Sequence, residues 1–303
     1  MAGRGITMIK TNDRERTSPL PDILLVLTAA ACLLPLIVAL SSSFSDEADI
    51  VKNGYCIVPR LFSTETYRFL LSSKTKILLR SYANTILVVC AGTLYTMTIT
   101  VCYAYAIAQK RRVFPLGQAL SFFAWFTTVF GGGVLPWYIL CTRYYGLHNN
   151  LWALFIPYGM NVFNMFILRS SFKALPEELT EAARIDGAAN LQIFLRIALP
   201  LAKSSLVTVT LFTVLAYWND FTLPLYLVTT NENYTIQKLL YNMMANITAL
   251  LSGRGSNITT HMVLPSNTAR MAMTVLTVLP IAVIFPFAQK FFVKGITVGA
   301  VKG

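Results

Sequence analysis

The chain has 303 residues, of which 55% are hydrophobic and only 13% are charged, and its mean hydropathy is +0.58. This composition excludes an ordinary soluble domain and a disordered chain, and it indicates a membrane protein. The formal net charge is +12. No nucleic-acid-binding motif accompanies the basic residues, so we assign this charge to membrane topology and lipid headgroups and expect no nucleic-acid partner.

Six apolar runs are each about as long as the roughly 20 residues that cross a bilayer. They cover residues 23–44, 83–108, 113–135, 147–168, 204–228 and 271–289. The sequence therefore predicts an all-α, polytopic membrane protein with six transmembrane helices. We expect a cytoplasmic N-terminal segment (1–22), a transmembrane domain (23–293) and a tail (294–303), with both termini cytoplasmic because Lys and Arg are enriched on that side.

Two stretches around the second and third runs are ambiguous. Basic residues alternate with apolar ones between Arg60 and Arg80, which predicts an interfacial amphipathic helix before the second span. Three glycines, Gly131 to Gly133, precede Pro136 at the end of the third run. They weaken a helix end and allow close backbone approach, so they form either a hinge or a tight packing site, and we favour packing.

The fourth run contains Asn161 and Asn164, three residues apart and hence on one helical face about midway through the membrane. Amides at this depth need partners: they line a sugar path or form hydrogen bonds between helices, and we favour the structural interpretation. Pro157 and Gly159 predict a bent helix here.

The fifth run ends in Trp218, Asn219 and Asp220. Asp220 is the only acidic residue in any of the six runs, which makes it a candidate functional residue at the outer gate. Alternatively, it reaches water or caps a short helix after the span. We place Trp218 in the outer aromatic belt.

The polar outer loop over residues 229–267 carries one apolar stripe at helical spacing. Its members are Tyr234, Ile236, Leu239, Leu240, Met243, Met244 and Ile247. A loop of this length is uncommon without a role, so it either reaches toward a partner or caps the helix bundle.

The loop over residues 173–200 is too polar to cross a membrane, although it lies between two apolar runs. Pro176 suits the first helical position, Glu177 and Glu178 complement the helix dipole, and Gly187 can close the helix in the left-handed conformation. We expect Asn190 to cap a second helix that ends before Leu199. That helix carries Ile193, Phe194 and Ile197 on one face.

This arrangement resembles the cytoplasmic EAA loop of ABC importer permeases. The matching residues are Glu181, Ala182, Ala183, Gly187, Ile197, Leu199 and Pro200. The ending, with Gly299 and Lys302, resembles that of MalG-like carbohydrate permeases. Residues 130–136, 151–154 and 161–169 are similar to the oligosaccharide and polysaccharide subgroup of the YtcP and LplC type.

The resemblance implies a type I ABC importer permease fold in the cell membrane, with a coupling helix around Glu181 to Gly187, including Asp186, and with Gly299 and Lys302 contacting the ATPases. It further implies that the chain forms half of a pore for a carbohydrate, either an oligosaccharide or a polysaccharide fragment. The implied partners are a sister MalF-like permease, an extracytoplasmic solute-binding protein and an ABC ATPase dimer that binds ATP and Mg²⁺. In such permeases the outer loop reaches toward the binding protein.

Two other classes of membrane protein are the alternatives. A secondary transporter should carry ionisable residues in mid-membrane, and apart from the peripheral Asp220 the six runs have none. A membrane hydrolase should show a catalytic motif such as HExxH or GxSxG, and neither occurs. The chain also lacks the GxxxxGK[ST] phosphate loop, so we expect a non-catalytic subunit without a cofactor or metal of its own.

Overall fold

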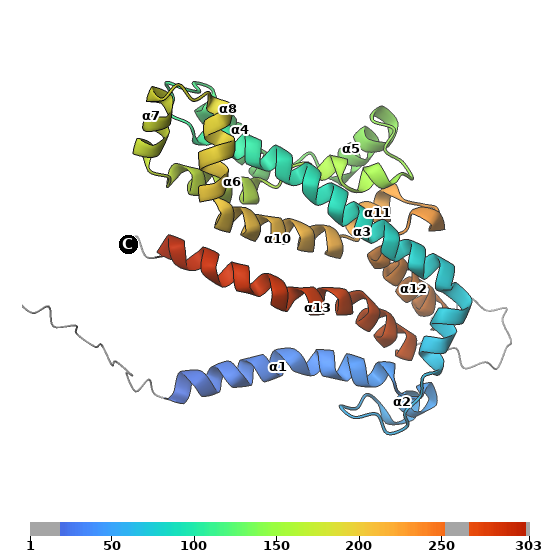
Figure 1. The fold of residues 1–303 in the computed structure, drawn as a ribbon. Coiled ribbons are helices and arrows are strands. Elements are labelled where there is room, and N and C mark those ends of the chain that lie inside the picture. The colour runs from blue at the N-terminus through green and yellow to red at the C-terminus, as the bar shows by residue number, and fades with distance from the viewer. Residues whose placement is uncertain (1–18, 252–266, 301–303) are drawn as a thin grey trace, which may run out of the picture.

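The computed structural model describes residues 19–251 and 267–300, and this part of the chain is built from helices without a β-strand. The long helices are α1 (Pro19–Ser43), α3 (Glu65–Ala108), α10 (Lys203–Asn219) and α13 (Asn267–Ala300). In Figure 1 α1 packs on α13, α13 on α10, and α10 on α3. We call one end of the bundle the α7 end, because α7 (Glu177–Ile185) lies there, at the same end as the start of α1. The opposite end, with α2 (Glu47–Asn53) and α12 (Ile236–Leu251), is the α12 end.

Several helices have the length and apolar composition of membrane spans. Pro21–Ser43 in α1 and Thr75–Ala108 in α3 each qualify alone. Three bent pairs qualify as broken spans: Gly117–Val129 with Val134–Tyr144 (113°), Leu151–Tyr158 with Val162–Lys173 (52°), and Asn190–Leu201 with Lys203–Asn219 (79°). Asn267–Val283 in α13 is a shorter apolar stretch. A multi-pass, all-α membrane protein is therefore confirmed, whereas the count of six spans stays a prediction.

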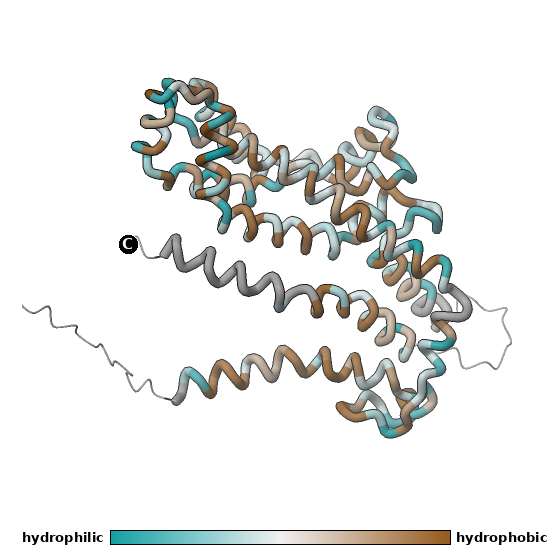
Figure 2. The backbone as a smooth tube through the Cα atoms, viewed as in Figure 1, coloured by the Kyte–Doolittle hydropathy of each residue, from teal (hydrophilic) through white to brown (hydrophobic). Residues whose placement is uncertain are grey.

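The surface of α1 is apolar along most of its length, as the brown tube in Figure 2 shows. Leu24 and Leu25 are 64% and 68% exposed, and no residue from Pro21 to Leu40 is buried inside the protein. A continuous apolar surface of this kind needs lipid or a second membrane subunit around it.

The expected interfacial helix before the second span is absent as a separate element. One antiparallel bridge joins Ser45, before α2, to Phe62, after it. α3 begins at Glu65 and continues unbroken to Ala108. Arg68 and Arg80 therefore lie on the membrane-spanning helix itself. The prediction was wrong because the region contains no helix breaker after Glu65, so the helix extends beyond the membrane.

The third span is broken at its glycines. α4 (Gly117–Val129) ends there, and α5 (Val134–Ile139) with the wide helical turn Leu140–Tyr144 leaves at 113°. A Cβ atom at Gly131 or Gly132 would meet nothing within 4 Å, and Gly133 has φ +82°. The tight-packing interpretation is thus wrong for the described residues, and these glycines form an irregular break at which the chain bends.

Close packing occurs instead between α3 and α10. A Cβ atom at Gly92 would lie 2.8 Å from Cζ of Tyr217, whose hydroxyl is 2.7 Å from Oγ1 of Thr96. Nearby, the buried indole of Trp218 donates to the carbonyl of Thr277 at 3.2 Å. Trp218 therefore joins α10 to α13 in the core, and its placement in an outer aromatic belt was wrong.

Helix α12 caps the α12 end of the bundle. Its stripe residues Ile236 and Leu239 are buried and belong to one cluster with Leu70 of α3 and Met273 of α13. The predicted apolar stripe is confirmed over this part, and its packing fits the capping alternative. The remainder of the loop, residues 252–266, lies outside the described residues.

Candidate functional site

A helix hairpin lies at the α7 end, and we call it the α7–α8 hairpin (residues 177–193). α7 has Glu177 and Glu178 in its first turn and ends at Ile185, with Asp186 as its C-cap. Gly187, at φ +81°, donates to the carbonyl of Arg184 at 3.0 Å, and Ala188 donates to that of Ala183 at 2.9 Å. These two bonds form a Schellman motif, which needs a left-handed residue at the glycine position. The predicted helix and its glycine stop are confirmed.

The second helix differs from the prediction at both of its ends. α8 (Asn190–Ile193) has Ala189 at its N-cap, where the backbone N–H donates to Oε1 of Gln192 at 2.9 Å. The helix also continues past Leu199, through a π-helical turn (Phe194–Ala198) and α9 (Leu199–Leu201). The wide turn brings the N–H of Leu199 to the carbonyl of Phe194. The 79° bend follows at the break between Leu201 and Lys203.

The base of the hairpin is anchored in the core. Phe194 is buried and lies 4.7 Å, centroid to centroid, from Tyr105 of α3, which also contacts Phe172 of α6 (Val162–Lys173) at 5.5 Å. Ile193 and Ala198 are fully buried in the same region. This packing connects the hairpin rigidly to α3 and α6.

The tip of the hairpin, in contrast, is open. Ile185 is 87% exposed and Leu191 is 66% exposed, although both are apolar. The predicted coupling residues Glu181, Ala182, Asp186 and Gly187 are also exposed, while Ala183 is half-buried. Of the downstream members, Ile197 and Leu199 are half-buried and Pro200 is exposed. An anchored helix with exposed apolar residues at its tip can dock into a cleft of another protein.

Charges fix α7 to the turn between α3 and α4. The ammonium of Lys110 is hydrogen-bonded to Glu177 and lies 3.8 Å from the carboxylate of Glu181. The hydrogen bond that Lys110 donates to Glu177, together with the two carboxylate charges, raises the pKa of Lys110. We call the contact of Lys110 with Glu177 and Glu181 the clasp. A cavity of about 490 Å³ lies beside it, and Arg169, Arg184 and the two glutamates help to line this cavity.

Sequence reasoning missed the role of Lys110. It identified this residue only as one of the basic charges that mark the cytoplasmic side. Its partners lie far away in the chain, and no spacing rule connects them.

The two asparagines of the fourth span do not share a face. Asn161 precedes α6 as its exposed N-cap, and its Oδ1 accepts from the backbone N–H of Asn164 at 3.0 Å. Asn164 itself is buried. The two short 3₁₀ helices Leu151–Leu154 and Ile156–Tyr158 break the span before α6. The shared-face prediction was therefore wrong, while the predicted bend, at 52°, is confirmed.

Asp220 caps a short helix, which was the predicted alternative to a role at the outer gate. Its Oδ1 accepts from the backbone N–H groups of Thr222 and Leu223, at 2.9 and 3.3 Å, at the start of α11 (Thr222–Leu227). The exposed Asn219 donates to the carbonyl of Leu215 at 2.9 Å. The adjacent acid and amide thus have local backbone partners.

The end of the chain is only partly described. The backbone of α13 is helical as far as Ala300, which includes Gly299. Lys302 lies outside the described residues, so the expected contact between the tail and an ATPase stays a prediction.

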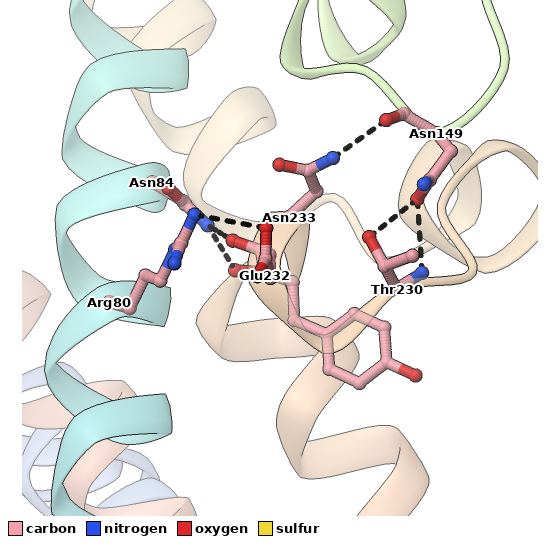
Figure 3. Close-up of polar contacts among 7 residues, drawn as sticks. Arg80, Asn84, Asn149, Thr230, Glu232 and Asn233 are labelled. Atoms are coloured by element: carbon pink, nitrogen blue, oxygen red, sulfur yellow. Dashed lines mark hydrogen bonds and ion pairs between the residues drawn. The ribbon is translucent and has the colours of Figure 1, made fainter.

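A polar network at the α12 end was not foreseen from the sequence (Figure 3). Asn149, with φ +54°, accepts from the N–H and the hydroxyl of Thr230 at 3.0 and 2.9 Å. Asn84 of α3 donates to the carbonyl of Glu232 at 2.8 Å, and Arg80 pairs with the carboxylate of Glu232 at 3.4 Å. The Asn149–Asn150 pair was the available signal, because Asn tolerates the left-handed conformation. The network fixes the connection between α11 and α12 on α3.

Comparisons with known proteins cover nearly the whole chain. Residues 110–298 match the family described as "Binding-protein-dependent transport system inner membrane component". The chain is 32% identical to the polygalacturonan/rhamnogalacturonan transport system permease protein YtcP of Bacillus subtilis (strain 168), over 92% of this chain and 96% of that protein. It is 33% identical to protein LplC of the same strain, over 90% of each.

A solved structure is similar as well. It is the crystal structure of a bacterial ABC transporter involved in the import of the acidic polysaccharide alginate, and the match has a TM-score of 0.77 at 29% identity. The match covers 90% of this chain and 95% of the other. The family match begins at Lys110 and includes the whole α7–α8 hairpin.

Proposed function

Because the chain belongs to the family of binding-protein-dependent transport system inner membrane components, we propose that it forms half of the translocation pore of an ATP-driven carbohydrate importer. The cargo we propose is an oligosaccharide or a polysaccharide fragment. Similar proteins support this class of cargo, since their names include polygalacturonan and rhamnogalacturonan transport and the import of alginate.

The α7–α8 hairpin is the proposed contact with the ATPase subunits. The observation that carries this assignment is the contrast between its buried base at Phe194 and its open tip at Ile185. When two ATPase subunits close on ATP and Mg²⁺, a hairpin fixed in this way moves as one body and tilts α6 and α10 with it. Ala182 presents a slim face to a cleft, and Glu181 offers a charge for an ion pair with the partner.

The remaining partners follow from the same proposal. A second, MalF-like permease completes the pore, and an extracytoplasmic binding protein delivers the cargo at the α12 end. The α7 end then faces the cytoplasm, and both termini lie on that side. This chain hydrolyses nothing itself, and the ATP is bound by its partners.

The first test is purification of the chain in mild detergent, followed by identification of the proteins that accompany it. We expect a second permease, an ATPase and hydrolysis that the binding protein and an oligosaccharide stimulate. Recovery of the chain alone, with uptake set by an ion gradient, would overturn the proposal in favour of secondary transport.

The second test compares two glutamates of α7. Glu178→Lys is the matched control for Glu181→Lys, because both side chains are exposed on the same helix and Glu178 makes no ion pair among the described residues. We expect Glu181→Lys to lower uptake about tenfold or more while ATP hydrolysis continues, since one lost charge-assisted contact has that size. Glu178→Lys should leave uptake close to normal. Equal uptake in the two variants would contradict the assigned contact.

A further inference from the structure

One face of α4 carries a row of exposed phenylalanines. Phe122, Phe126 and Phe130 follow one another at a spacing of four residues, with exposed fractions of 63%, 40% and 63%. Their ring centroids are 6.5 Å and 4.5 Å apart, so the rings form a continuous surface. Eight residues of helix correspond to about 12 Å along the axis. We call these three residues the aromatic ladder.

The aromatic ladder ends at exposed backbone. Phe130 donates to Phe126 at 3.0 Å, but the N–H groups of Gly131, Gly132 and Gly133 have no hydrogen-bond partner within residues 19–251 and 267–300. All three glycines are exposed, and the chain turns away by 113° after them. Polar backbone groups therefore lie beside the last ring.

These groups exclude hydrocarbon as the environment of the three glycines at the end of the aromatic ladder. α4 starts next to the basic turn at Lys110, and Gly131 lies about 20 Å further along the axis, within the roughly 30 Å of hydrocarbon. An unpaired backbone group in hydrocarbon costs several kcal/mol, so irregular backbone at this depth lines water or is covered by protein. The open space around Gly131 and Gly132 favours water.

A sugar ring matches this combination of groups. Its C–H faces stack on aromatic rings, and its hydroxyls exchange hydrogen bonds with free amides. α4 carries no charged residue between Gly117 and Val129 that would hold a sugar too tightly to release it. We infer that the aromatic ladder and the amides of Gly131 to Gly133 form a carbohydrate-binding subsite in the translocation path. This inference rests on the proposed function.

The experiment uses the reconstituted complex with its sister permease, ATPase and binding protein. The probes are oligogalacturonide, rhamnogalacturonan fragments and alginate oligomers, and the probe that most stimulates ATP hydrolysis is used for uptake. If none stimulates the wild-type complex, the proposed function fails, and the subsite fails with it. If one does, Phe126→Leu tests the subsite separately.

Phe126→Leu should raise the half-saturating sugar concentration for uptake about fivefold, because it keeps apolar volume and removes one stacking face. Basal ATP hydrolysis and recovery of the sister permease should not change. Phe126→Tyr should restore normal uptake, since it retains the ring. The matched control is Phe62→Leu, which removes an exposed ring (69%) that stacks on Phe44 beside α1.

Two outcomes would overturn the subsite. If Phe126→Leu releases the sister permease, the aromatic ladder is an interface between the two permeases. If its half-saturating concentration equals that of Phe62→Leu, the rings do not contact the cargo.

Discussion

The ammonium of Lys110 lies 3.8 Å from the carboxylate of Glu181, although the first belongs to the α3–α4 turn and the second to α7. Glu177, one helical turn earlier, accepts a hydrogen bond from the same ammonium. The clasp therefore connects the proposed ATPase contact to the end of α3, which is the longest described helix. Glu181 is still 62% exposed and can reach a partner at the same time.

We predict that Lys110→Met weakens coupling without preventing assembly. Exposed ion pairs add little to stability, but this pair sets the position of α7 relative to α3. The ratio of sugar imported to ATP hydrolysed should therefore fall, while the yield of the complex stays normal. Arg112→Met, in the same turn and without an ion pair among the described residues, is the control. A complex that loses its ATPase in Lys110→Met would show that the residue holds the partner directly.

The effect of the Lys110 ion pairs on coupling should change with salt concentration but not with pH across the neutral range. Because Glu177 raises the pKa of Lys110, the contribution of the pair is complete below the unfolded pKa and is lost only as pH rises through the higher folded value. We therefore expect the difference in coupling between wild type and Lys110→Met to be constant across neutral pH. It should shrink as ionic strength increases, because salt screens exposed charges. A difference that vanishes between pH 6 and pH 8 would contradict this.

Gly187→Ala should impair coupling, and Gly54→Ala is the control at a positive-φ glycine outside the hairpin. Both glycines have φ between +76° and +81°, and a Cβ atom at either would meet nothing within 4 Å. Alanine costs about 1–2 kcal/mol in the left-handed conformation of Gly187. It costs more at Gly54, whose ψ of −177° lies in a region that essentially only glycine adopts, so Gly54→Ala is the more severe backbone change. We expect uptake to fall in Gly187→Ala, since the Schellman motif aims the hairpin, and to persist in Gly54→Ala. Equal losses would indicate a general effect of strain.

The sequence predicts α7 well because every signal for it is local. The glutamates of its first turn and Gly187 lie within eleven residues, and each acts on its own helix end. The packing of Phe194 on Tyr105 could not be read in this way, because it depends on α3. The same tertiary contact accompanies the π-helical turn that carries the helix past Leu199.

Sequence alone does not predict the position of a side chain that suits two different environments. Trp218 suits either a membrane interface or a core in which its indole N–H finds a carbonyl. The carbonyl of Thr277, far away in the chain, accepts this hydrogen bond and keeps Trp218 in the core. Asn161 suits a helix face or a helix cap, and the break after Tyr158 makes it a cap. Only the folded chain distinguishes these alternatives.

Glu47→Ala should destabilise the α12 end. This buried carboxylate accepts from the backbone N–H and the side-chain amide of Asn267, at 2.9 and 3.1 Å. It also accepts from the N–H and the hydroxyl of Thr268, at 2.8 and 2.7 Å. It therefore holds α2 on the first turn of α13, where negative charge is favoured.

Leaving these donors unpaired should cost about 3 kcal/mol. Thermal unfolding in detergent measures the loss, with the exposed Glu65→Ala as the control. An unchanged melting temperature in Glu47→Ala would show that water replaces the carboxylate.

Substitutions of Asp220 can distinguish a helix-capping role from a role that needs its negative charge. Its Oδ1 accepts from Thr222 and Leu223, and an asparagine can accept the same two bonds without carrying a charge. We therefore expect near-normal uptake in Asp220→Asn and reduced uptake in Asp220→Ala, where losing the cap costs about 1 kcal/mol and frees the start of α11. Uptake and thermal stability are measured on the same two preparations. Equal loss of uptake in both variants, with stability lost only in Asp220→Ala, would instead mean that transport needs the negative charge, as gating or ion coupling would require.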